Sequence, residues 1–179
     1  MKRYGDKMYN IGDVVAYGTT GVCRIDSECE QKAKGIKRKY LVLKPLHQLN
    51  STVYVPMDNE NLMGKLKKLL TKEDIDGIIS AAADEETHWI TNESERTSKF
   101  REIIKSGDRF QLMQMVRVLY KKQRERFAKG KRLHASDEML FREAERLLFD
   151  EFAVVLGIST DQVFEFISQK LGHTAASSQ

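Results

Sequence analysis

The first seventy residues have the hydrophobic pattern of short β-strands. β-branched and aromatic residues gather in four runs, at residues 13–17, 22–29, 40–43 and 51–55. The run at 40–43 is apolar without alternation, which predicts a strand buried on both faces. A turn or short helical step is expected at 56–61, followed by a last strand at 65–70. This spacing predicts a small sheet that curls into an open barrel with an exposed edge.

The segments between these runs are expected to be turns. The GTTG segment at 18–21 predicts a hairpin, and the polar segment at 32–37, which contains a glycine, predicts a second turn. Pro56 ends the fourth run because proline cannot donate to a sheet ladder. Residues 1–7 are expected to lack regular structure, either as a short extension or because Met8 is an alternative start.

From Thr71 onward the apolar spacing changes from two residues to about 3.6, which is typical of helices. Capping residues predict helix starts at Thr71, Asn92, Asp108, Ser136 and Ser159. An acidic break is expected at 81–87, AAADEET. The chain is therefore predicted to be an α+β protein of two domains, a barrel at 8–70 and a helical domain at 71–172. The boundary is expected within 70–87, and 173–179 is predicted to be a disordered tail.

Composition and motifs narrow the class of protein. The chain of 179 residues is 41% apolar, has no run of eighteen apolar residues and begins without the apolar segment of a signal peptide. We expect a soluble, cytoplasmic protein that does not bind membranes, with Cys23 and Cys29 reduced. The four histidines lack zinc spacing, and no phosphate-cradling glycine loop follows a strand. A binding protein is expected rather than an enzyme, with no cofactor, no metal and no small-molecule substrate.

Positive charge is concentrated in one part of the helical region. Residues 96–132 carry a net charge of +10, whereas 71–95 and 133–179 are both net acidic. Its densest part holds Arg117, Lys121, Lys122, Arg124, Arg126, Lys129, Lys131 and Arg132. Arg117, Lys121 and Arg124 share one helical face, opposite the apolar residues needed for a core. Such a surface attracts phosphate backbones without sequence preference, although a run of charges is often only a solvated face.

Trp89 is the one tryptophan and precedes the helix predicted from Asn92. It lies outside any regular apolar stripe. One interpretation is an anchor packed against the helical domain. The other is an exposed aromatic wedge beside the basic surface, of the kind that nucleic-acid proteins use to stack on or unstack a base step.

The segments IGDVVAYGTTGVCRI, KRKYLVLKPL and STVYVPMDNENL, followed by THW, KSGD and DEMLFREAERLLFDEFA, resemble the CarD/CdnL family of bacterial transcription regulators in order and spacing. The resemblance covers the whole chain. It implies an SH3-like, Tudor-like N-terminal module that binds the RNA polymerase β subunit. It also implies a helical C-terminal domain that touches promoter DNA at the upstream edge of the −10 element, with a tryptophan in the minor groove.

Carried over to this sequence, the resemblance makes Trp89 the wedge and places Lys121, Lys122, Arg124 and Arg126 on the family's basic helix. Gln31 and Tyr54 occupy positions where some members have polymerase-contacting arginines. In many members arginines follow the tryptophan at once, whereas here the first is Arg96. The third helix, basic at its start in some relatives, here begins with Asp137 and Glu138, preceded by Lys129, Lys131 and Arg132.

These observations favour a regulator that bridges RNA polymerase and promoter DNA and stabilises the open complex. Two alternatives remain. In the first, the barrel itself is a general nucleic-acid-binding module, for which Tyr17, Tyr40 and Tyr54 would serve, although they are more simply barrel core. In the second, the barrel is the polymerase-binding module of a transcription-coupled repair translocase, but the sequence has no P-loop for the motor.

Overall fold

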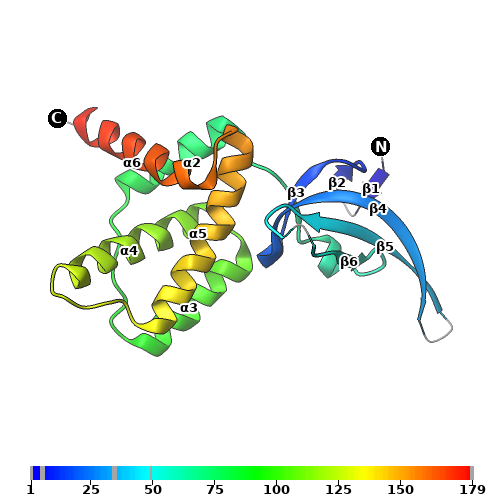
Figure 1. Cartoon of the computed structure of the whole chain (residues 1–179), viewed down its shortest axis with the longest axis horizontal. Coiled ribbons are helices and arrows are strands. Elements are labelled where there is room, and N and C mark those ends of the chain that lie inside the picture. The colour runs from blue at the N-terminus through cyan, green and yellow to red at the C-terminus, as the bar shows by residue number, and fades with distance from the viewer. Residues whose placement is uncertain (1, 5–6, 34–35, 49, 178–179) are drawn as a thin grey trace. The chain divides into compact units, whose positions relative to one another are not determined.

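The computed structural model describes residues 2–4, 7–33, 36–48 and 50–177 (Figure 1). The chain divides into two compact units, Met1–Leu69 and Leu70–Gln179. Each unit buries a separate hydrophobic core, so each has the organisation of a domain. The predicted α+β architecture, a small sheet followed by helices, is confirmed.

The N-terminal unit is a five-stranded antiparallel sheet with the order β6-β5-β4-β3-β7. Its strands are β3 Val14–Tyr17, β4 Gly21–Ala33, β5 Ile36–Pro45, β6 Val53–Pro56 and β7 Leu66–Lys68. The 3-10 turn η1, Gly18–Thr20, joins β3 to β4 in the hairpin predicted at GTTG. The short helix α1, Glu60–Met63, lies between β6 and β7, where a helical step is expected.

One face of this sheet forms the core of the unit. Leu41 and Leu43 of β5 and Val55 of β6 are fully buried on it. Val42 points to the opposite face and is also buried, which confirms the strand predicted to be buried on both sides. The Tyr9 hydroxyl donates a hydrogen bond to the Leu66 carbonyl oxygen at 3.1 Å, so the two ends of the unit are tied together.

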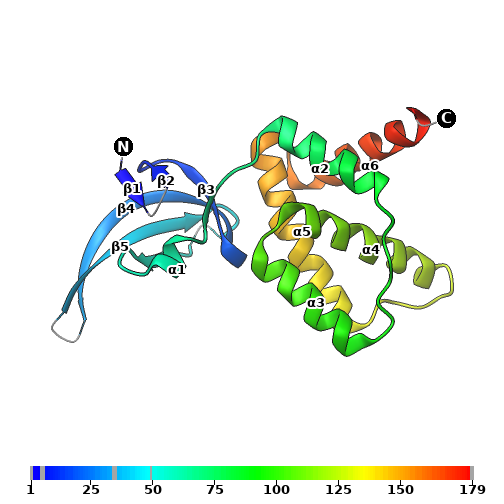
Figure 2. The ribbon, with the colours of Figure 1, turned by 180° about the vertical axis from the view of Figure 1, so that it is seen from behind.

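The strands β4 and β5 extend further than the sequence pattern predicts. Gln31 pairs with Arg38 and Lys32 with Lys37, so most of the predicted polar turn belongs to the hairpin (Figure 2). The pattern missed this part because both of its faces carry polar, exposed side chains, which leaves no alternation to detect. The expectation that residues 1–7 lack regular structure is wrong for residues 2–4 and 7, since β1 Lys2–Tyr4 and β2 Lys7–Tyr9 form an antiparallel pair.

The interpretation of three tyrosines as barrel core holds for Tyr17 alone. Tyr17 is buried in the core cluster, whereas Tyr54 is 50% exposed. Tyr40 and Tyr54 lie on the opposite face and meet edge to face, with ring centroids 6.5 Å apart. Leu41 and Val55 point into the core. Because side chains alternate between the two faces of a strand, their neighbours Tyr40 and Tyr54 point outward.

The described part of the C-terminal unit consists of five helices, of which α5 contacts the other four. They are α2 Lys72–Asp84, α3 Glu93–Ser106, α4 Arg109–Phe127, α5 Ala135–Leu156 and α6 Thr160–Ser177 (Figure 1). Thr71 and Asp74 form a capping box at the start of α2, while Asn92 and Asp108 cap α3 and α4 by accepting backbone N–H groups. Among the described residues, no helix is long and apolar enough to cross a membrane.

Two helices of this unit continue past their expected ends. The helix α2 includes the alanines of AAADEET, which are strong helix formers, and ends at Asp84. The backbone of α6 continues through Gly172 to Ser177, although 173–179 is predicted to be a disordered tail. Residues 178–179 of that tail lie outside the described residues.

Candidate nucleic-acid interface

The helix α4 separates its apolar and cationic residues on different sides. Leu112, Met113, Met115, Val116 and Leu119 are buried in the core of the C-terminal unit. Lys121 and Arg124 on α4, and Lys129, Lys131 and Arg132 after it, are exposed, while Arg117, Lys122 and Arg126 are half-buried. The eight cations predicted to bind DNA are therefore presented unequally.

Arg117 is engaged within the unit. Its guanidinium donates to the Glu85 carbonyl oxygen at 3.3 Å and to the Gln114 side-chain oxygen at 3.0 Å. The Gln114 amide in turn donates to the Glu85 carboxylate. Burial lowers the pKa of Arg117, and the Glu85 carboxylate acts in the opposite direction. Arg117 thus holds the acidic segment after α2 against α4.

Trp89 lies beside the cations and is half-buried against the core of the unit. The Lys122 ammonium is 5.1 Å from the centre of its ring, and the Arg96 guanidinium carbon is 4.3 Å from it. Both separations suit cation–π attraction. Lys122 also pairs with Glu125 at 3.0 Å, and this hydrogen bond holds the pKa of Glu125 below its usual range. The structure therefore combines features of the anchor and of the wedge interpretations.

Arg96 fixes the segment that carries Trp89. It is buried and forms a bidentate ion pair with Asp137 of α5, with nitrogen–oxygen distances of 2.8 and 2.9 Å. Its remaining terminal nitrogen donates to the carbonyl oxygens of Ile90 at 2.8 Å and Thr91 at 3.2 Å. The first arginine after the tryptophan is thus part of the interior, and so is the acidic residue at the start of α5.

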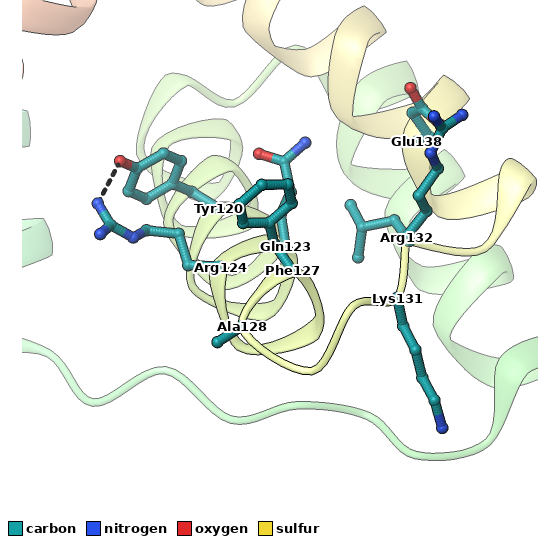
Figure 3. A pocket seen from close by; sticks show the side chains of 9 residues that line it. Tyr120, Gln123, Arg124, Phe127, Ala128, Lys131, Arg132 and Glu138 are labelled. Carbon is teal, nitrogen blue, oxygen red and sulfur yellow. Dashed lines mark hydrogen bonds between the residues drawn. The ribbon is translucent and has the colours of Figure 1, made fainter.

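The segment after α4 turns back beside the helix. Gly130 has a φ of 66°, and its N–H donates to the Phe127 carbonyl oxygen at 2.9 Å. The Arg126 side chain donates to the Arg132 carbonyl oxygen at 2.6 Å, which closes the turn. A groove with a volume of about 580 Å³ lies between this turn, the end of α4 and the start of α5 (Figure 3). The hydrogen bond to the Arg132 carbonyl oxygen explains why Arg126 is half-buried.

The predicted polymerase-contacting residues share one face of the N-terminal sheet. Gln31 is exposed and pairs with Arg38, which lies two residues before Tyr40 and hence on the same side of β5. Tyr54 meets Tyr40 on that side, from β6 at one end of the strand order. Arg38 forms an exposed ion pair with Asp58 at 3.3 Å. The two residues therefore belong to one polar and aromatic surface.

The sequence patterns did not reveal the buried ion pair beside the candidate nucleic-acid interface, or one exposed ring. The Arg96–Asp137 pair joins residues that are distant in sequence, so no local pattern reveals it. Phe127 is 81% exposed at the end of α4 and escaped notice among its charged neighbours. Its spacing of seven residues from Tyr120 places both rings on one helical face, and this spacing can be read from the sequence.

The described residues contain no group of three His, Cys, Asp or Glu side chains placed to hold a metal ion. In comparisons with known families, residues 9–67 match the model of the CarD-like/TRCF RID domain. Residues 77–168, more than half of the chain, match the model of the CarD C-terminal domain. The two matches fall in the two compact units, in the order of the chain.

Proposed function

The chain belongs to the CarD family of RNA polymerase-interacting transcription regulators, and from this premise we propose that it bridges the polymerase β subunit and promoter DNA. In this proposal residues 8–70 bind polymerase and residues 71–172 bind DNA near the upstream edge of the −10 element. The protein acts in the cytoplasm, without catalysis. The observation that carries the proposal is the position of Trp89 beside Lys122 and the cationic face of α4.

The cations would bind the DNA backbone. Lys121, Arg124, Lys129, Lys131 and Arg132 are exposed in a segment with a net charge of +10, which attracts phosphates at a distance. Arg117 and Arg126 support this surface by holding the segments on either side of it. Phosphate contacts give position without reading sequence. The cations would therefore hold a duplex next to Trp89.

Trp89 would act on the equilibrium between closed and open promoter. Placing a ring between base steps costs a few kcal/mol of unstacking, and that cost is smallest where the duplex is already melting. A ring that binds the melted junction better than the intact duplex shifts the promoter toward the open state. The contacts of Arg96 to Ile90 and Thr91 favour this role, because a wedge must be held rigidly to be inserted.

The test is Trp89→Ala in a reconstituted transcription assay with the full chain. We expect the lifetime of the open complex to fall markedly while affinity for intact duplex changes little. Met139→Ala, which removes an exposed apolar side chain of α5, is the control. An unchanged open-complex lifetime in Trp89→Ala would refute the wedge. So would thermal melts showing a loss of folding large enough to explain the shorter lifetime.

A second function is favoured by the pair of Tyr54, which is exposed, and Tyr40, which is half-buried, on the outer face of the sheet. Aromatic side chains on a sheet surface are a common platform for single-stranded nucleic acid. In that case Tyr54→Ala would weaken nucleic-acid binding by the full chain. Under the bridging function the same change weakens capture of the purified β subunit and leaves DNA affinity unchanged, so the two functions are separable.

A further inference from the structure

The groove at the end of α4 combines two aromatic rings with three cations. Phe127 and Tyr120 line it on the side of α4, and its lining also includes Arg124, Lys131, Arg132, Leu133 and one acidic residue, Glu138, toward which the Arg132 side chain extends (Figure 3). Leu133 is buried, which gives the groove an apolar base. An apolar surface edged by cations fits a ligand with flat apolar groups and negative charges.

Phe127 has the exposure of a residue held for a ligand. Its ring is 81% exposed and therefore gains little burial from folding. Yet the backbone under it is ordered. The Ala128 N–H donates to the Arg124 carbonyl oxygen at 3.0 Å, and the Gly130 N–H donates to the Phe127 carbonyl oxygen at 2.9 Å. The positive φ of Gly130 then reverses the chain and returns Lys131 and Arg132 to the groove.

Tyr120 and Arg124 are also positioned before any ligand binds. The Tyr120 ring packs on Phe164 with centroids 5.2 Å apart, and the Arg124 guanidinium donates to the Tyr120 hydroxyl at 3.3 Å. The guanidinium carbon is 5.9 Å from the centre of the same ring. The Arg124 guanidinium is therefore held beside the Tyr120 hydroxyl (Figure 3).

We propose that this groove binds single-stranded nucleic acid, with an unpaired base stacked on Phe127 and neighbouring phosphates held by Arg124, Lys131 and Arg132. A duplex hides the faces of its bases, so a protruding ring stacks on them only at the cost of unstacking a base step, whereas an unpaired strand offers them without that cost. An acidic peptide would satisfy the cations but leave the exposed ring without a partner. The inference rests on the proposed function in one respect, since a protein that favours melted promoter DNA encounters unpaired strands.

The test uses the full chain with a labelled oligothymidylate of about 12 nucleotides, a length within the range of single-strand sites, and a duplex of equal length. Fluorescence anisotropy gives the affinity of each. Phe127→Ala should weaken oligothymidylate binding by about tenfold, as expected for loss of one base–aromatic stack, and change duplex binding by less than about twofold. Phe127→Tyr keeps the ring and should retain the affinity.

Met139→Ala is the matched control, because Met139 is 56% exposed on α5 and does not line the groove. It should leave both affinities unchanged. Equal losses for oligothymidylate and duplex in Phe127→Ala, or no loss for either, would overturn the single-strand site and leave the bridging function standing. If the unmodified chain binds neither nucleic acid but binds a polyglutamate peptide, both the site and the proposed DNA contact are wrong.

Discussion

Arg96 is the residue on which the conformation around Trp89 depends. It joins α3, the Trp89 segment and α5 through contacts to Ile90, Thr91 and Asp137. Arg109 offers a matched comparison, since it forms a bidentate pair with the buried Glu151 at 2.9 and 3.0 Å. Arg109 lies about 20 Å before Lys122 along α4, at 1.5 Å per residue. A comparison of variants at the two arginines therefore separates a local effect on Trp89 from a general loss of stability.

We expect Arg96→Gln and Arg109→Gln each to lower the free energy of unfolding by about 3 to 5 kcal/mol, because each removes the cationic partner of a buried carboxylate. Only Arg96→Gln should increase acrylamide quenching of the single tryptophan under conditions where both variants are folded. Urea titrations give the stability, and steady-state fluorescence gives the quenching. Similar quenching in the two variants would show that Arg96 does not position Trp89.

Cys23 gives the N-terminal unit a pH-dependent contribution to stability. The residue is fully buried, and burial raises the pKa of its thiol to about 11. The folded unit therefore holds the neutral thiol more strongly than the unfolded chain does. This contribution is complete at neutral pH and is lost as the pH rises through the ordinary thiol range toward 11.

Urea unfolding of the natural chain and of Cys23→Ala at pH 7 and pH 10 tests this expectation. The stability advantage of the natural chain over the variant should shrink at pH 10. Taking the difference between the two chains removes the effects of lysine ionisation, which they share. Burial and the Cys23 thiolate both raise the pKa of Tyr17, so Tyr17 acts in the same direction as Cys23. An advantage that is constant or grows with pH would contradict the assignment.

At the scale of elements, the cationic face of α4 should act through phosphates. Replacing Lys121, Lys122 and Arg124 by Ala should weaken binding to all duplexes alike and reduce the slope of log affinity against log salt by roughly one for each lost contact. Arg101, Lys99 and Lys105 on the exposed side of α3 provide a triple Ala control of equal charge. An unchanged slope in the α4 variant would mean that its cations are only solvated.

The sequence predicts elements well where local signals suffice. Thr71, Asn92 and Asp108 cap helices as expected, because a cap is decided within three residues. Gly157 closes α5 with a φ of 70°, again a local effect. The outer part of the β4–β5 hairpin was not predicted, since its ladder forms between exposed polar residues. The outward position of Tyr54 depends on which face of the sheet is covered, and that is a property of the whole unit.

The same limit applies to the candidate site. The cations of α4 are visible in the sequence, because charge density and helical spacing are local. The unequal availability of these cations is not visible in the sequence, because Arg117 donates a hydrogen bond to Glu85, more than thirty residues earlier. Asp137 resembles a solvated acid at a helix start until Arg96 is placed beside it. Long-range pairing therefore decides which charges remain available to a ligand.

At the scale of the whole molecule, the proposed function divides two linked contacts between the two compact units of the chain. Once one unit is bound, the other acts at a high effective concentration, so neither contact needs to be tight alone. Weakening the polymerase contact by Tyr54→Ala should therefore raise the protein concentration needed for half-maximal open-complex stabilisation and leave the maximum unchanged. Trp89→Ala should lower the maximum instead. Titrations of both variants measure the two effects, and a lowered maximum for Tyr54→Ala would contradict linked binding.

The contacts between the beginning and the end of the N-terminal unit have a consequence for biosynthesis. The strand β3 pairs with β7 through Val15 and Lys68, and Tyr9 bonds to Leu66 across 57 residues. During translation one edge of β3 remains without its partner until β7 has left the ribosome. The sheet therefore cannot be completed strand by strand as it emerges, and an unpaired edge is exposed to other nascent chains in the interval.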